Sequence, residues 1–366
     1  MIKATRDKSI DLLRGIAVFL VLWGHVIQYM SLNEIDFFED IVFRFIYGFH
    51  MGLFMFISGY LFYNSNHKYT LFSFIIKMFK TVLYPIILWN SVLFLINFPK
   101  VIIDIINGNG NYFDIIKSLY SSMGNLWFLW SLLFYSIIFA IIINLTKKTW
   151  SLIIGLFIGV IILYLLSWNS GFYIWMFPYY IGGYYFHHIK NLKISIFKTE
   201  KRNQWLWIIS IISTILYLIL LQFFHREDLI YLSGLTGLIN NKGILYQIFV
   251  DAFRWLFGFI GIAAIYCWIH IIIPFTKETG IIYKLLDLAG HKSLQIYILQ
   301  SFLLERLFFL LYAFISNRYD LTALTSNIEI YNYLITPIVA FGFLLICLMC
   351  SNIIDKIGLN KYLFGR

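Results

Sequence analysis

The chain has 366 residues, of which 61% are hydrophobic and only 13% are charged. A soluble globular domain carries roughly 45–50% apolar and about 25% charged residues, so this composition excludes both a soluble globular protein and a disordered one. The net charge is +10, from 28 Lys and Arg against 18 Asp and Glu. In a membrane protein such an excess indicates basic cytoplasmic loops before it indicates a nucleic-acid partner, and we expect no nucleic acid here.

The chain contains ten apolar stretches that are candidates to cross the hydrocarbon core of a bilayer, which takes about 20 residues in a helix, and the sixth of them is short. We therefore expect an all-α integral membrane protein, a polytopic bundle of about ten transmembrane helices that forms a single domain over residues 1–366. The predicted spans are 11–30, 41–63, 81–98, 126–145, 150–167, 172–186, 205–224, 250–272, 293–313 and 331–354.

Counting Lys and Arg in alternate loops predicts the orientation of these spans. With the N-terminus inside, the cytoplasmic segments hold nineteen basic residues and the outer segments five. Because cytoplasmic loops are enriched in Lys and Arg, this asymmetry places both termini in the cytoplasm. The longest loops, 99–125 and 225–249, leave no room for an attached soluble domain.

The first span carries a polar stripe on an otherwise apolar helix. Arg14 and His25 are eleven residues apart, three helical turns plus about 20°, so they share a face. Asp11 and Gln28 extend the same stripe. Ionisable residues within a span are costly and indicate a functional site. The structural alternative is that Arg14 reaches to lipid phosphate and His25 donates to a carbonyl group.

The ninth span carries a second polar stripe with the spacing of a helix. Ser293, Tyr297, Ser301 and Glu305 follow one another at intervals of four residues, which predicts a face directed into the bundle. Glu305 is the carboxylate that we expect to orient the His25 ring. The alternative for Glu305 is a structural ion pair with Arg306.

Other ionisable residues have stronger structural alternatives. His50 lies within the second span. Arg44 and Arg254 are expected near the outer interface, where they could serve only as anchors. Lys77 and Lys80 precede the third span, where Lys and Arg commonly anchor a helix at the cytoplasmic face.

The motifs of soluble enzymes are missing from the sequence, among them the Walker A loop, GxGxxG, HExxH and GxSxG. His187 and His188 are adjacent, but no carboxylate or cysteine with the spacing of a metal ligand accompanies them. We therefore expect no metal and no permanently bound cofactor.

Several motifs resemble those of the membrane-bound acyltransferase-3 family, in the expected order along most of the chain. In the first span (IDLLRGIAVFLVLWGH, residues 10–25) an Arg is followed after ten residues by a His. Residues 49–59 (FHMGLFMFISG) resemble the family's second-span motif and residues 127–129 (WFL) the start of its fourth span. Residues 293–300 (SLQIYILQ) resemble a late motif that usually ends in His, where this chain has Gln300.

The resemblance implies a fold of ten helices and an O-acyltransferase of the bacterial plasma membrane. Acetyl-CoA or another acyl-CoA would be the co-substrate, and the acceptor would be a hydroxyl of a cell-surface polysaccharide or its lipid-linked precursor. The family's essential histidine and arginine correspond to His25 and Arg14. Its basic pair that contacts CoA, often two arginines, corresponds to Lys77 and Lys80.

The remaining site residues are expected to bind or orient the substrate. They are Asp11, His50, Tyr297 and Gln300, and their partner molecules are the acyl-CoA, the sugar acceptor and the lipid bilayer.

A polytopic glycan transporter, flippase or polymerase is the alternative function. A polymerase would more typically have a large outer loop with several Arg residues, and a transporter would have Gly- or Pro-broken helices paired between two halves. The five prolines, at 85, 99, 178, 274 and 337, show no such pairing. A purely structural scaffold would leave the stripe of the first span unexplained.

Overall fold

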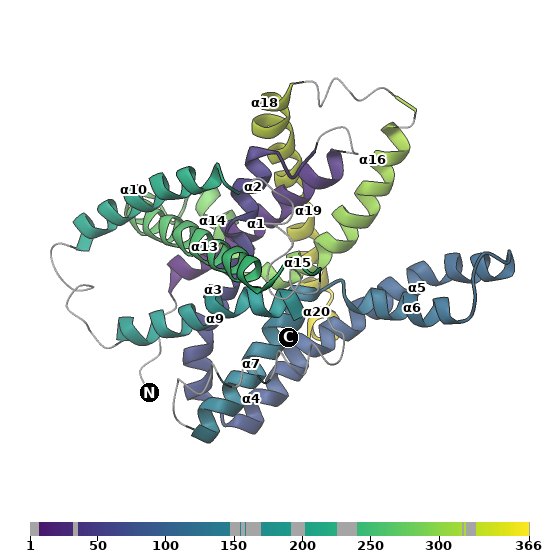
Figure 1. Ribbon diagram of the computed structural model, residues 1–366, viewed down its shortest axis with the longest axis horizontal. Coiled ribbons are helices and arrows are strands. Elements are labelled where there is room, and N and C mark those ends of the chain that lie inside the picture. The colour runs from purple at the N-terminus through teal and green to yellow at the C-terminus, as the bar shows by residue number, and fades with distance from the viewer. Residues whose placement is uncertain are drawn as a thin grey trace. The chain divides into compact units, whose positions relative to one another are not determined.

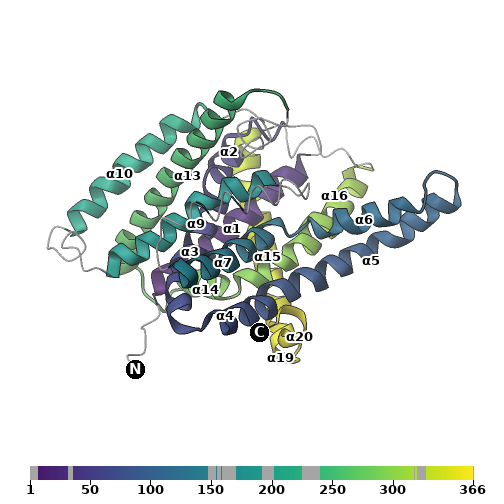
Figure 2. The ribbon, with the colours of Figure 1, turned by 60° about the horizontal axis from the view of Figure 1, so that its bottom comes forward.

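The computed structural model describes residues 7–31, 36–146, 154, 158, 170–191, 202–224, 240–316, 318–319 and 327–365, and these residues form helices joined by turns (Figures 1 and 2). The helices are α1 (Lys8–Met30), α2 (Ile41–Tyr47), α3 (His50–Lys68), α4 (Leu71–Met78), η1 (Phe79–Leu83), α5 (Tyr84–Ile106), α6 (Phe113–Met123), α7 (Trp127–Thr146), α9 (Ser170–Asn191), α10 (Arg202–Leu221), α13 (Ile244–Ile272), η3 (Ile273–Phe275), α14 (Ile281–His291), α15 (Ser293–Phe302), η4 (Leu303–Phe308), α16 (Phe309–Ser316), α18 (Ile328–Ile330), η5 (Tyr331–Ile335), α19 (Thr336–Lys356) and α20 (Asn360–Phe364).

Within the described ranges, eight helical segments are long and apolar enough to cross a membrane. They correspond to eight of the ten predicted spans, which confirms the expected all-α polytopic membrane protein. The predicted span 172–186 falls within α9, which is not one of the eight, and the span 150–167 lies outside the described residues except at Ile154 and Ile158. The count of ten and the cytoplasmic placement of the termini stay predictions.

The exposed faces of several helices are apolar, as a lipid-facing surface requires. On α10, Ile212, Ile215 and Ile219 lie at intervals of three and four residues, and about half of the surface of each is exposed. Such a face would be costly in water, whereas it costs nothing among lipid tails. The same helix packs its opposite face along α13, where the rings of Tyr217 and Phe257 stack with centroids 4.2 Å apart.

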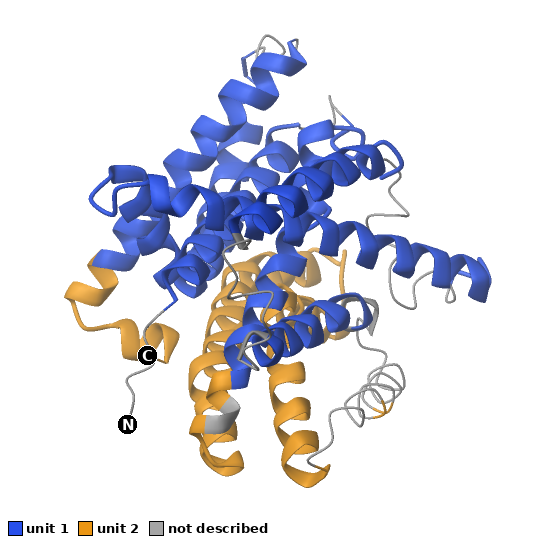
Figure 3. Cartoon of the chain, turned by 90° about the vertical axis from the view of Figure 1, so that its left-hand side faces the viewer, with its two compact units in different colours: residues 1–63, 173–352 blue, residues 64–172, 353–366 orange. Residues whose placement is uncertain are grey.

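The chain divides into two compact units, coloured separately in Figure 3. Unit 1 comprises Met1–Tyr63 and Tyr173–Asn352. Helix α1 is central to this unit because it contacts α2, α13, α14, α15 and η4. Its first turn is capped by the Asp7 side chain, which accepts a hydrogen bond from the backbone N–H of Ser9.

Helices α1 and α14 cross with their backbones in contact. A Cβ atom on Gly15 of α1 would lie 2.0 Å from the carbonyl oxygen of Leu286, and one on Gly290 of α14 would lie 1.9 Å from the carbonyl oxygen of Asp11. Each helix thus contributes the glycine that the backbone of the other requires. Close approach of this kind is the usual role of small residues between membrane helices, and it fixes α14 against the first turns of α1.

Unit 2 comprises Asn64–Phe172 and Ile353–Arg366. Helices α5 and α6 pack side by side, and α4 packs on α7. The C-terminal segment is tied to α5 by the indole N–H of Trp89, which donates to the Leu363 carbonyl at 2.9 Å, and by the hydroxyl of Tyr84, which donates to the Tyr362 carbonyl at 2.6 Å. Buried Asn90 donates to the Met123 carbonyl at 3.1 Å.

Candidate active site

His25 of α1 faces Glu305 of η4. The His25 Nε2 and Glu305 Oε1 atoms are 3.6 Å apart, and about a quarter of each side chain is exposed. The His25 ring stacks nearly parallel to the ring of Tyr29, with centroids 5.8 Å apart and planes inclined by 16°. Its Nδ1 atom is buried and has no hydrogen-bond partner. The geometry therefore directs Nε2 toward the carboxylate and places a base beside a negative charge.

Hydrogen bonds anchor helix α1 on both sides of His25. The indole N–H of Trp23 donates to the Thr336 hydroxyl at 2.9 Å, and the Tyr331 hydroxyl donates to the carbonyl of Ile27 at 2.9 Å. These bonds lie two residues before and two residues after His25. Such anchoring limits the rotation of the helix and so holds the imidazole on the face that meets Glu305.

Gln300 of α15 touches the same carboxylate. Its Nε2 group donates to Glu305 Oε1 at 2.8 Å, and only 2% of the residue is exposed. The other polar atom of this amide, Oε1, is buried without a hydrogen-bond partner. Tyr297, one turn earlier on α15, is also buried.

Arg14 meets the start of the same helix. Its guanidinium donates to the Ser293 hydroxyl at 2.6 Å, and a guanidinium nitrogen lies 4.0 Å from the Asp11 carboxylate. Helix α1 therefore contacts the α15–η4 segment at two levels, through Arg14 near one end and through His25 eleven residues later. The shared face that the sequence predicts for these two residues is directed at one partner segment.

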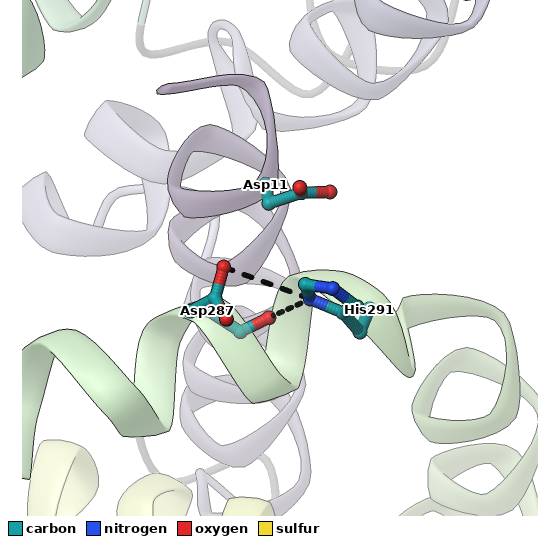
Figure 4. Close-up of side chains that lie close together, drawn as sticks. All are labelled: Asp11, Asp287 and His291. Atoms are coloured by element: carbon teal, nitrogen blue, oxygen red, sulfur yellow. Dashed lines mark hydrogen bonds and ion pairs between the residues drawn. The ribbon is translucent and has the colours of Figure 1, made fainter. Parts of the chain in front are cut away.

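Asp11, Asp287 and His291 form a small cluster of ionisable side chains (Figure 4). Asp11 comes from α1, whereas Asp287 and His291 lie one turn apart on α14. One potential ligand atom from each lies within 4.8 Å of the other two, a set that suits a divalent cation. The guanidinium of Arg14, however, already brings a positive charge to the Asp11 carboxylate.

His291 also interacts with Asp287 of its own helix. Its Nδ1–H donates to the Asp287 carbonyl at 2.6 Å, and the same nitrogen lies 3.6 Å from the Asp287 carboxylate. We therefore interpret this cluster as polar packing at the crossing of α1 and α14, with Asp11 as the member that faces Arg14. Sequence reasoning missed Asp287 and His291, although their spacing of four residues before the ninth span was a usable signal.

His50 is the first residue of α3 and is not part of the polar stripe of α1. It is buried at the start of α3, where its Nδ1–H donates to the Ile46 carbonyl at 2.8 Å. Its ring packs against Tyr47 with centroids 4.8 Å apart, and the Tyr47 hydroxyl donates to Gln28 of α1 at 3.4 Å. His50 is thus linked to the stripe through Tyr47 and Gln28.

Lys77 and Lys80 belong to unit 2, and their relation to Arg14 stays a prediction. The Lys77 ammonium lies over the ring of Tyr69, 4.5 Å from its centroid. Lys80 lies in the π-helical segment η1, and its carbonyl oxygen faces Gly365, where a Cβ atom would lie 1.9 Å away. In unit 2 the C-terminal residues thus pack closely against the backbone beside Lys80.

Arg254 departs from the expectation of an interfacial anchor. It is only 2% exposed, and its guanidinium carbon lies 4.0 Å from the centroid of the Trp175 ring. Asp251, one turn earlier on α13, is also buried and accepts a hydrogen bond from Gln247 at 2.9 Å. The sequence alone did not reveal this burial, because Arg254 lies near the predicted end of an apolar span.

Comparison with known proteins shows which protein family the chain resembles. A family profile described as an acyltransferase domain matches residues 7–354. Nodulation protein NolL of Mesorhizobium japonicum is 30% identical over 127 residues, which cover 34% of this chain and 33% of that protein. Nodulation protein NolL of Sinorhizobium fredii is 46% identical over 57 residues, which cover 15% of this chain and 16% of that protein. The alignments thus span a third or less of these relatives, and no solved structure matches significantly.

Proposed function

The chain belongs to the acyltransferase-3 family, and we propose that it transfers an acyl group, in particular acetyl, from acyl-CoA to a hydroxyl of a surface polysaccharide or its lipid-linked precursor. It is a multi-pass membrane acyltransferase. The proposed location is the plasma membrane of a bacterium, with the acyl-CoA entering from the cytoplasm.

The observation that carries this proposal is the placement of His25 beside Glu305 within membrane-spanning helices. A sugar hydroxyl is a poor nucleophile until a base removes its proton as the new bond forms, and imidazole is the side chain best suited to this at physiological pH. When His25 takes the proton, its positive charge arises 3.6 Å from the Glu305 carboxylate. A negative charge at this distance would stabilise the positive charge that develops on the ring during proton transfer and so would lower the barrier.

The proposed reaction balances without a further co-reactant. The hydroxyl oxygen attacks the thioester carbonyl while His25 accepts the hydroxyl proton. A carbon–oxygen bond forms, the carbon–sulfur bond breaks, and the CoA thiolate leaves. The imidazolium returns its proton to the sulfur, which gives CoA and the acylated sugar and regenerates the neutral base.

Other residues have supporting roles in this proposal. Arg14, held by Ser293 and near Asp11, supplies a fixed positive charge on the stripe that leads to His25. Lys77 and Lys80 would neutralise phosphates of CoA as point charges. His50 and Tyr297 would help to shape the space that the acceptor enters.

The test uses membranes with and without the chain, supplied with radiolabelled acetyl-CoA. We expect label in the glycan fraction only when the chain is present, and mild alkali should release it, because an ester is hydrolysed where an amide is not. Comparison of the lipid-linked and polymeric fractions identifies the acceptor. Equal labelling in both membranes, or label that resists alkali, would contradict transfer to a hydroxyl.

A further inference from the structure

One oxygen of Glu305 serves two neighbours. Oε1 accepts a hydrogen bond from Gln300 at 2.8 Å and lies 3.6 Å from His25 Nε2. The distance to Gln300 is that of a direct hydrogen bond to a charged acceptor, whereas the distance to His25 is longer than a hydrogen bond. The position of the carboxylate is therefore set by the amide, and the imidazole faces a charge that another residue holds.

The chemistry of the carboxylate fixes the orientation of the amide. An ionised carboxylate can only accept hydrogen bonds, so Gln300 must present its NH₂ group to Glu305. The amide oxygen is left buried without a partner as a result. A buried unpartnered acceptor costs free energy, and the reversed amide would place two acceptors against each other, which costs more. The Glu305 carboxylate thus decides which way the Gln300 amide points. The Gln300 amide in turn holds the carboxylate in place.

A local change of helix type makes this contact possible. Gln300 and Glu305 are five residues apart, and in a regular α-helix the residue five positions on points about 140° away. Gln300 lies in α15, whereas Glu305 is the third residue of η4, a π-helix over Leu303–Phe308 whose wider turn reduces this angle. The wider turn also reduces the drift of Glu305 from the face of Ser293, twelve residues earlier.

We propose that Gln300 is a positioning residue that acts on the reaction through Glu305, an inference that rests on the proposed function. The amide and the π-helix together hold the carboxylate on the face that α1 presents with His25. The amide of Gln300 has no charge to gain or lose, so its role is to position Glu305 and not to exchange protons. A hydrogen bond to a charged group is the stronger kind, and its loss should slow the chemical step.

The experiment is a double-mutant cycle with Gln300→Met, which keeps the length of the side chain, and Glu305→Gln. In the otherwise wild-type chain, Gln300→Met should lower kcat for acetyl transfer about tenfold and leave KM for acetyl-CoA unchanged. In the Glu305→Gln background the same change should cost less than about twofold, because the bond it removes no longer carries charge. Rates are normalised to folded protein by thermal unfolding in detergent, and Gln300→Leu replaces Gln300→Met if the latter does not fold.

Ser210→Ala is the control, since the Ser210 hydroxyl is buried on α10 of the same unit and donates to the Trp207 carbonyl at 2.9 Å. It should retain the wild-type rate. Equal losses from Gln300→Met in both backgrounds, or a wild-type rate for Gln300→Met, would overturn the inference and leave the proposed function intact. A wild-type rate for His25→Ala would instead overturn the proposed function itself.

Discussion

Helix α1 makes two contacts of opposite character within unit 1. Near its start it meets α14 backbone to backbone, where Gly15 and Gly290 leave no space for even one more carbon atom. Further along it meets η4 through side chains, where His25 and Glu305 lie 3.6 Å apart and remain about a quarter exposed. The first contact is closed between the two backbones, whereas the second is made by side chains and is partly open.

The contact with α14 holds α1 in position, whereas the contact with η4 contains the candidate active site. A backbone contact without side chains cannot adjust, so it sets the position of α1. The contact with η4 contains buried polar atoms without partners, at His25 Nδ1 and Gln300 Oε1, which natural proteins tolerate mainly where function requires them. Substitutions at the two contacts should therefore affect different properties, stability at the first and turnover at the second.

The largest effect expected on stability is at the closed contact. Gly15→Ala places a methyl group against the Leu286 carbonyl, which cannot move independently of α14. Overpacking of this kind typically costs about 1–3 kcal/mol, so the variant should unfold at a clearly lower temperature in detergent. Gly342→Ala is the control, because nothing lies within 4 Å of its Cβ position, and alanine is the better helix former. Equal stability of the two variants would contradict the assignment of this crossing as scaffold.

At the open contact, Glu305→Gln should reduce kcat by about tenfold to hundredfold, because it removes the charge that stabilises protonated His25. Its unfolding temperature should stay close to that of the wild type. Glu329→Gln removes a carboxylate from an exposed position of the same unit and should have no effect on the rate. A kcat unchanged in Glu305→Gln would make the carboxylate a structural partner only.

Arg14 tests whether the polar stripe acts as a unit. Arg14→Lys keeps the positive charge but loses the planar fork that reaches Ser293, so transfer should fall by about threefold to tenfold. Ser293→Ala should cause a similar loss, and the double variant should be little worse than either, as assayed by initial rates at equal amounts of folded protein. A wild-type rate for Arg14→Lys would indicate a residue that only reaches to lipid phosphate.

The smallest expected effect lies in unit 2. Lys77→Ala combined with Lys80→Ala should raise KM for acetyl-CoA by about threefold while kcat is retained, since Lys77 is partly exposed and Lys80 is exposed, and charges that water reaches add little to phosphate binding. Lys117→Ala, a charge of the same unit paired with Asp114, is the control. An unchanged KM in the double variant would restrict both lysines to anchoring the membrane helix.

Much of the fold could be predicted because membrane spans are encoded in composition and length. The apolar runs give the helices, and the eleven-residue spacing of Arg14 and His25 gives one face of α1. The π-helix that carries Glu305 could not be predicted, since no residue pattern specifies it and tertiary packing decides it. The four-residue spacing therefore indicated that Glu305 shares a face with Ser293 and Tyr297, but it gave no sign of the five-residue link to Gln300.

The surroundings of several charged residues also could not be predicted from the sequence. Asp287 and His291 lie in a segment that reads as a cytoplasmic loop, and only the crossing of α14 with α1 brings them to Asp11. Arg254 reads as an anchor, but the rings of Trp175 and Phe224 enclose it. Both cases depend on contacts between residues far apart in the chain, which one sequence does not reveal.

The most direct test of the central claim is the initial rate of acetyl transfer by His25→Ala in membranes, at an amount of folded protein matched to the wild type. Loss of a general base should lower the rate by about a hundredfold to ten-thousandfold. The control is His270→Ala, since the ring of His270 packs against Tyr266 on its own helix and donates to that residue's carbonyl. The account predicts a loss of this size for His25→Ala alone, and a rate within twofold of the wild type would contradict it.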